Sequence, residues 1–194
     1  MNPDIRAGVQ RAYSAAAENP QAEHPFPVGR SFAESLGYSP DVLATIPAAA
    51  VDAFAGVSNV AVFAEIPPGA TVLDLGCGAG LDSLIAARRV GPTGKIIGID
   101  FSEAMLVRAR QAAAEAGINN VEFRQADAEN LSLDDASIDV ALVNGIFNLN
   151  PARDCIFSEL ARVVRPDGAI YAAELILREP LPSETQASET NWFA

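Results

Sequence analysis

The feature that most constrains the fold is an alternation of short apolar runs with helical segments, which begins near Pro67. Runs that are apolar on both faces indicate strands covered on both sides of a sheet, and they lie at 70–75, 94–100, 121–126, 138–145 and 169–177. Helical spacing of apolar residues separates them at 83–90, 102–117 and 151–165, and Pro166-Asp167-Gly168 is expected to close the last helix. Strands that alternate with helices form parallel sheets with right-handed crossovers. The sequence therefore predicts an α/β fold built on a doubly wound sheet.

The first third of the chain has a different character. Asn2-Pro3 is a typical helix start, short helices are expected at 31–36, 40–46 and 59–66, and a proline-rich loop spans 18–30. Because strand patterns are missing, we interpret residues 1–66 as an N-terminal helical cap or lid. Residues 67–178 form the predicted core, and residues 179–194 form a C-terminal tail in which Trp192 and Phe193 are candidates for an anchor or a subunit contact.

Charge and cysteine content exclude several classes of partner. The net charge of −12, from 13 Lys+Arg and 25 Asp+Glu, argues against nucleic acid and anionic membrane surfaces. No apolar run approaches the about 20 residues of a membrane span, and no signal peptide is visible. Cys77 and Cys155 are far apart without metal-ligand spacing, so we expect reduced thiols, no bound metal and a cytoplasmic location.

In sheets of this kind, ligands bind beyond the carboxyl ends of the strands. The first predicted strand ends in a glycine loop, Asp74-Leu75-Gly76-Cys77-Gly78-Ala79-Gly80. Its G-x-G-x-G spacing differs from the G-x-G-x-x-G of dinucleotide sites. The carboxylate of Asp74 would oppose a pyrophosphate but suits a cationic amine. Taken alone, the loop could also be a simple turn between strand and helix.

The next two strand ends supply matching groups. Asp100, 20 residues beyond Gly80, can accept both hydroxyls of a ribose, and Phe101 with Met105 can form an apolar wall for adenine. Asp127-Ala128 can accept from an exocyclic amine and donate a backbone N–H. Phe101 and Met105 could instead be ordinary core residues. Together these groups indicate an adenosyl ligand with a cationic amino-acid tail and no phosphate, which is S-adenosylmethionine (SAM).

Five motifs carry a resemblance to a known family. VLDLGCGAG, GIDFSEAML, FRQADAENL, IDVALVNGIFNL and VVRPDG, in this order, resemble class I SAM-dependent methyltransferases over about residues 67–178. LGYSPDVLATIP and NGIFNLNPARD narrow the resemblance to the arsenite methyltransferase branch, with ubiquinone/menaquinone-biosynthesis methyltransferases next. The resemblance implies a Rossmann-like sheet of strand order 3-2-1-4-5, SAM as cofactor and S-adenosylhomocysteine (SAH) as product.

The resemblance also implies roles for individual residues. Asp74 and the glycine loop (Gly76, Cys77, Gly78, Gly80) would face the methionine part, Asp100 the ribose, Phe101 and Met105 the adenine ring, and Asp127 with Ala128 the adenine edge. Asn144 and Gly145 would pass beside the methionine part and the activated methyl. Tyr13 resembles an N-terminal tyrosine that closes over the cofactor in this family.

The sequence departs from the arsenite branch in two ways. Where that branch carries an arsenic-binding cysteine, this chain has Gly145, and its loop EHPFPVG has no paired cysteines. Family members also continue past the fifth strand with a helix and two antiparallel strands, whereas 17 residues follow Leu177. We therefore expect a sheet truncated after strand five, with an apolar edge that the tail, the N-terminal helices or a second subunit covers.

These observations predict a SAM-dependent methyltransferase for a small-molecule acceptor. The alternative is a SAM-binding module that lacks a complete substrate pocket and is inactive alone, and a nicotinamide-dependent oxidoreductase is disfavoured by the glycine spacing. Methyl transfer depends mainly on alignment of the reactants. The sequence therefore identifies no catalytic residue. Tyr13, His24 and Glu174 are candidates for a general base, and a solvated loop position is the simpler interpretation of His24.

Overall fold

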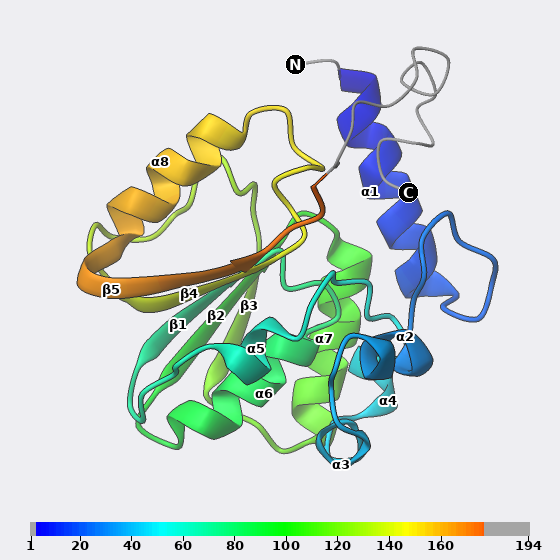
Figure 1. Ribbon diagram of the computed structural model, residues 1–194, viewed down its shortest axis with the longest axis horizontal. Helices are drawn as coiled ribbons and strands as arrows, with labels where there is room; N and C mark the ends of the chain where they lie inside the picture. The colour runs from blue at the N-terminus through cyan, green and yellow to red at the C-terminus, as the bar shows by residue number, and fades with distance from the viewer. Residues whose placement is uncertain (1–2, 177–194) are drawn as a thin grey trace.

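The computed structural model describes residues 3–176 (Figure 1). Within that range a five-stranded sheet has the order β3-β2-β1-β4-β5, and every neighbouring pair is parallel. The strands are β1 (Thr71–Leu75), β2 (Lys95–Asp100), β3 (Val121–Gln125), β4 (Ile138–Asn144) and β5 (Val164–Ala173). The α/β class and the strand order predicted from the sequence are confirmed.

Helices cover both faces of the sheet. On one face lie α5 (Val60–Phe63), α6 (Leu81–Val90) and α7 (Glu103–Glu115), and on the other lies α8 (Arg153–Val163) (Figure 1). Side chains alternate between these layers: Val72 of β1 joins the buried cluster under α6 and α7, and Leu73 joins the cluster under α8. Both faces of the sheet are therefore buried under helices and shielded from water.

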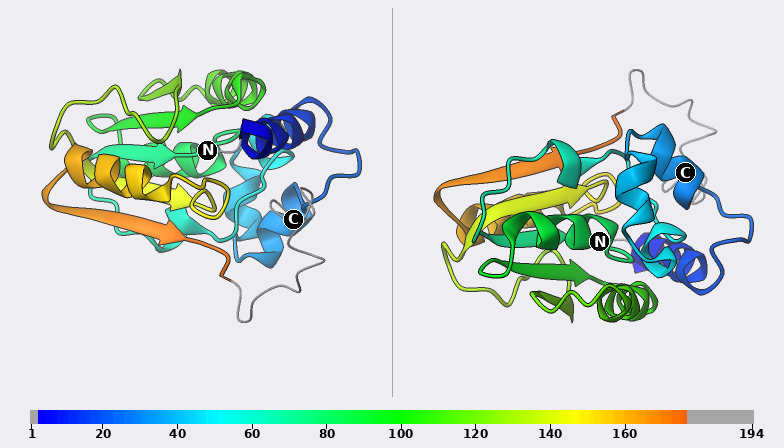
Figure 2. Two further views of the ribbon diagram at one scale, coloured as in Figure 1. Left: turned by 90° about the horizontal axis from the view of Figure 1, so that it is seen from above. Right: turned by 90° about the horizontal axis from the view of Figure 1, so that it is seen from below.

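The N-terminal residues form α1 (Pro3–Glu18) and the short helices α2 (Arg30–Ser35), α3 (Pro40–Ala44) and α4 (Ala48–Val51). Figure 2 shows the strand arrows pointing toward α1 and these short helices, so the N-terminal segment lies beyond the carboxyl ends of the strands. Buried residues between Ala33 and Ile66 share one hydrophobic cluster with α6, α7 and the sheet. The segment is therefore packed into the same core as the sheet.

The last helix and strand differ from the sequence prediction. The helix ends at Val163, and β5 begins at once at Val164 instead of at residue 169. Pro166-Asp167-Gly168, expected to follow a helix, lies inside β5, where the pairing with β4 shifts register between Ile138 and Val140. A bulge at a sheet edge absorbs a proline and the positive φ of Asp167 (65°). The strand ends at Ala173, and residues 177–194, including the predicted tail, lie outside the described residues.

Candidate cofactor-binding site

One cavity opens at the carboxyl ends of β1, β2, β3 and β4, under α1 and the α4–α5 connection. Of the twelve residues predicted to bind the cofactor, eleven line this cavity: Asp74, Gly76, Cys77, Gly78, Asp100, Phe101, Met105, Asp127, Ala128, Asn144 and Gly145. Residues from four strand ends thus meet at one place, as the sequence predicted. Their contacts with a cofactor remain a prediction.

Gly80, the twelfth residue, does not line the cavity. It has φ 89° at the N-cap of α6, and a Cβ there would lie 3.1 Å from both Ala109 Cβ and Phe123 Cζ. Its glycine is explained by the left-handed turn and by close packing of α6 against α7 and β3. Gly76 does line the cavity, and a Cβ there would lie 2.3 Å from Ile146 Cγ2, so a side chain at position 76 would collide with Ile146.

Asp74, at the end of β1, is buried with 2% of its surface exposed. Ser83 Oγ donates a hydrogen bond of 2.5 Å to its Oδ2. Burial, and next the charge of Asp82, raise the pKa of Asp74 to about 8. A carboxyl group in this state becomes a favourable partner for a cation that enters the cavity, because the cation stabilises the ionised form.

Asp100, at the end of β2, is held in one orientation by the backbone. Its Oδ2 accepts from Gly78 N at 2.9 Å and its Oδ1 from Ser102 N at 2.8 Å. Burial raises its pKa to about 6, while these N–H groups oppose the increase. The N–H of Phe101 also stabilises the ionised form. A carboxylate has about four acceptor positions, so acceptor capacity remains for the hydroxyls of a ribose.

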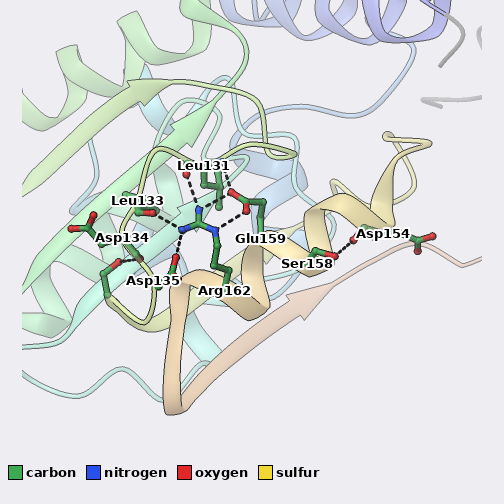
Figure 3. Close-up of polar contacts among 9 residues, drawn as sticks. Leu131, Leu133, Asp134, Asp135, Asp154, Ser158, Glu159 and Arg162 are labelled. Carbon is green, nitrogen blue, oxygen red and sulfur yellow. Dashed lines mark hydrogen bonds and ion pairs between the residues drawn. The ribbon is translucent and has the colours of Figure 1, made fainter.

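Asp127, after β3, is half-exposed and forms an ion pair with Arg6 of α1. The loop that carries it is attached to α8 (Figure 3): Arg162 donates to Leu131 O at 2.9 Å and Leu133 O at 2.7 Å, and Glu159 accepts from Leu131 N at 2.6 Å. These bonds hold the segment after β3 at the mouth of the cavity. Arg6 therefore connects α1 to the predicted adenine-binding side.

The three candidate bases lie in different surroundings. Tyr13 lines the cavity, stacks on Phe26 at 4.5 Å between ring centroids, and has its pKa raised by burial and by the charge of Asp100. His24 lies outside the cavity lining, with Nε2 2.9 Å from Asn19 O. Glu174 also lies outside the lining and accepts from Phe147 N at 2.6 Å. Of the three candidates, Tyr13 alone is among the residues that line the cavity, and its raised pKa keeps its hydroxyl protonated at neutral pH. A general-base role for any of them remains a prediction.

Cys77 is buried within the glycine loop, and its Sγ would lie 3.1 Å from a Cβ at Gly98. Burial and the charges of Asp100 and Asp74 raise the pKa of its thiol. Cys155 is an exposed free thiol on α8. Among residues 3–176, no group of three or more His, Cys, Asp or Glu could hold a metal ion, and no helix is long and apolar enough to cross a membrane.

The sequence prediction missed several residues of the cavity. Arg6, Asp82 and the segment Phe54–Gly56 line it, and their contribution depends on tertiary contacts that no local pattern displays. Asp82 is the exception that could have been found, since it is an acidic residue two positions after the glycine loop, in the first turn of α6. That position alone is equally typical of a carboxylate at a helix N-terminus.

Comparison with known proteins defines the class of this chain. A family model described as a methyltransferase domain matches residues 66–193, so the chain belongs to this methyltransferase family. Its sheet order and flanking helices are those of SAM-dependent methyltransferases, which implies SAM as the cofactor.

Among individual relatives, an arsenite methyltransferase from Halobacterium salinarum is 38% identical over 156 residues, covering 80% of this chain and 40% of that protein. A demethylmenaquinone methyltransferase from Lactococcus lactis is 36% identical over 62% of this chain and 48% of its own length. A crystal structure of an arsenic(III) SAM methyltransferase from Chlamydomonas reinhardtii matches 81% of this chain and 58% of that chain with a TM-score of 0.71 and 30% identity. The match thus spans less than half of either sequence relative.

Proposed function

We propose that this chain is a SAM-dependent methyltransferase that transfers a methyl group to a small-molecule acceptor. The observation that carries the proposal is the convergence of Asp74, Asp100 and Asp127, from three strand ends, on one cavity. Bound SAM supplies an activated methyl group on a sulfonium. In this proposal Asp74 binds the ammonium group, Asp100 the ribose hydroxyls and Asp127 the adenine amine.

The contribution of the protein to the reaction is alignment and exclusion of water. The N-terminal segment lies over the strand ends and contributes apolar residues to the cavity, namely Val9, Ala50, Ala53 and Phe54. An apolar wall on this side suits an acceptor with a substantial apolar surface. Holding donor and acceptor in line contributes up to about 7–11 kcal/mol in favourable cases.

Calorimetric titration with SAH tests the cofactor assignment. We expect Asp100→Ala to weaken binding by at least about tenfold, because it removes two hydrogen bonds from a charged acceptor, and Asp127→Ala to weaken it less because that group is half-exposed. Asp134→Asn, an exposed carboxylate in the β3–β4 connection, is the matched control. Unchanged affinity in both test variants would exclude the proposed orientation of the cofactor.

Arsenite is disfavoured as the acceptor by the thiols of the chain. Trivalent arsenic is soft and binds thiolates, whereas Cys77 is buried with a raised pKa and Cys155 does not line the cavity. We expect a methyl-transfer assay with arsenite to give no methylated arsenic above the no-enzyme rate. Methylated arsenic above that rate would contradict this thiol argument, and its loss in Cys77→Ala or Cys155→Ala would show which thiol binds arsenite.

A second candidate function is a SAM-binding module that is inactive alone, which is favoured by the 40% span of the Halobacterium relative. Binding of SAH without transfer to any acceptor in a panel would support this alternative, and transfer to one acceptor would exclude it.

We further infer that the chain does not bind nucleic acid, given its charge of −12. The two free thiols favour a reducing compartment such as the cytoplasm. We also propose a homodimer through the edge of β5.

A further inference from the structure

We propose that Asp82 is a positioning residue for the cofactor site, which fixes the side chain of Asn144 and so joins the N-terminal segment to the turn after β4. The inference rests on the proposed function, since the turn in question lines the proposed SAM cavity. It assigns Asp82 and Asn144 a role in building the wall of that cavity.

Asp82 is 5% exposed and accepts hydrogen bonds from three parts of the chain. Tyr38 Oη donates to its Oδ1 at 2.6 Å, and Ala61 N donates to the same oxygen at 3.2 Å. Asn144 Nδ2 donates to its Oδ2 at 2.8 Å. One carboxylate in the first turn of α6 thus connects the N-terminal segment with the end of β4.

The hydrogen-bonding capacity of the Asn144 side chain is fully used. Its Oδ1 accepts from Val57 N at 2.8 Å and Ser58 N at 3.1 Å, and its Nδ2 donates to Ser58 O at 2.7 Å as well as to Asp82. Two donors and two acceptor positions are all that a carboxamide has. Asn144 therefore lines the cavity as part of its frame, and none of its side-chain hydrogen bonds is left for a ligand.

Two glycines allow the N-terminal segment to pack closely against the end of β4. A Cβ at Gly56 would lie 2.6 Å from Asn144 Nδ2, and a Cβ at Gly145 would lie 2.9 Å from Val57 Cγ1. The next residue, Ile146, packs directly against Gly76 of the glycine loop, and both residues line the cavity. Any movement of Asn144 would therefore displace the residues that surround the proposed methionine end of the cofactor.

Asp82→Asn tests the role of the carboxylate with almost no change in volume. If the new side-chain oxygen serves Tyr38 and Ala61, its NH₂ group faces the Nδ2 of Asn144, and two donors meet. Rotating Asn144 would break its bonds to Val57 and Ser58. We expect Asp82→Asn to weaken SAH binding by about tenfold, the size expected for one lost buried hydrogen bond to a charged group.

The swapped variant Asp82→Asn/Asn144→Asp tests the specific pairing of the two side chains, because exchanging them would not relieve a general loss of packing. The new amide at 82 can donate to the new carboxylate at 144, which still accepts from Val57 N and Ser58 N. The carboxylate oxygen that replaces Nδ2 then faces Ser58 O, an acceptor that has lost its donor, so the swap restores the contact with residue 82 and not the contact with Ser58. Asn144→Asp alone loses the same donor and also places two carboxylates together. We therefore expect the swap to bind SAH more tightly than Asn144→Asp, with a smaller loss than the two single losses combined, as a double-mutant cycle for coupled residues requires. The proposal is overturned if Asp82→Asn binds SAH like the wild type, or if the losses of Asp82→Asn and Asn144→Asp are additive in the swap.

Tyr38→Phe serves if the first variant fails to fold. It keeps the ring against Phe54 and removes only the hydroxyl that donates to Asp82 and, at 3.1 Å, to Ser58 O. We expect about a threefold loss of SAH affinity, and an unchanged affinity counts against the proposal.

The unfolding midpoint, measured without ligand for the wild type, Asp82→Asn, Asn144→Asp and the swap, separates this proposal from the proposed function. A wild type that binds no SAH refutes the function, and the cycle in unfolding then decides whether Asp82 fixes Asn144. Additive effects in that cycle would refute the coupling.

Discussion

At the residue scale, the three carboxylates that converge on the cavity differ in burial and in their neighbours. Asp74 and Asp100 are buried with pKa values raised to about 8 and about 6, whereas Asp127 is half-exposed beside Arg6. At neutral pH Asp74 is therefore largely protonated in the protein alone. A ligand that brings an ammonium group to Asp74 must then displace a proton.

We expect SAH binding to release a proton through Asp74. Below about pH 8 the free protein holds this proton, and the bound state with its ammonium partner does not, so affinity rises with pH up to about 8 and then levels. Titration calorimetry at pH 7 in two buffers of different ionisation enthalpy measures the release directly.

Asp74→Asn is the control for this proton, since it keeps the volume and removes the titrating group. We expect the variant to bind more weakly and with an enthalpy that no longer depends on the buffer. An equal buffer dependence in wild type and variant would assign the proton to another group. Because the charge of Asp82 contributes to the raised pKa of Asp74, Asp82→Asn should move the midpoint of the pH profile to lower pH.

At the element scale, α1 is attached to the core at both ends. Near its start Arg6 pairs with Asp127, and in its fourth turn Ser14 Oγ lies 2.9 Å from Ser102 Oγ. At its C-terminus Ala17 O accepts from the Nε of Arg108 on α7, and the Nη1 of Arg108 also donates to Ala49 O of α4 at 3.2 Å. Arg108 thus satisfies carbonyls at the end of one helix and within a second.

Removal of this guanidinium should loosen α1 and α4 together. We expect Arg108→Ala to lower the free energy of unfolding by about 1–2 kcal/mol, since two hydrogen bonds from a charged, partly buried donor are lost. Hydrogen exchange should become faster over the last turn of α1 and over α4. Arg153→Ala, on the exposed start of α8, is the comparison, and equal exchange in both variants would show that Arg108 does not hold these helices.

Elements with strong periodicity were predictable, and elements set by tertiary contacts were not. β1, β2 and β4 were found within one residue at each end because burial on both faces leaves a continuous apolar run. The edge strand β3 was found equally closely although Glu122 and Gln125 on it are exposed. The start of β5 was missed because Pro166-Asp167-Gly168 has the local chemistry of a turn, and the edge position that lets a bulge absorb it is not visible in the sequence. Helix α4, Ala48–Val51, was missed because four small apolar residues carry no periodicity.

In the site, too, residues placed by local sequence pattern were predictable, and residues placed by tertiary contacts were not. Asp74, Asp100 and Asp127 were predictable because each follows an apolar run, and parallel strands bring such positions to one edge of the sheet. Arg6 and Phe54 come to the cavity from segments more than forty residues apart, through packing of the N-terminal segment. The role of Asn144 depends on four partners that no spacing rule connects to it.

At the scale of the whole molecule, the exposed apolar surface lies partly along β5. This strand pairs only with β4 among the described strands, and Ile170 is 45% exposed on it. On α5, which packs against β5, Phe63 is 49% exposed and contacts Tyr171 edge-on at 6.3 Å. Unpaired backbone groups beside apolar side chains favour pairing with another chain.

The proposed homodimer predicts that a charge on this edge separates the subunits. We expect the wild type to elute at twice the monomer mass in size-exclusion chromatography with light scattering, and Ile170→Lys to elute as a monomer, since a lysine on an edge strand blocks edge-to-edge pairing. Val107→Lys is the matched control, because Val107 is 55% exposed on α7, which packs against β2 and β3, away from the β5 edge of the sheet. A monomeric wild type would exclude the dimer, and a dimeric Ile170→Lys variant would place its interface away from β5.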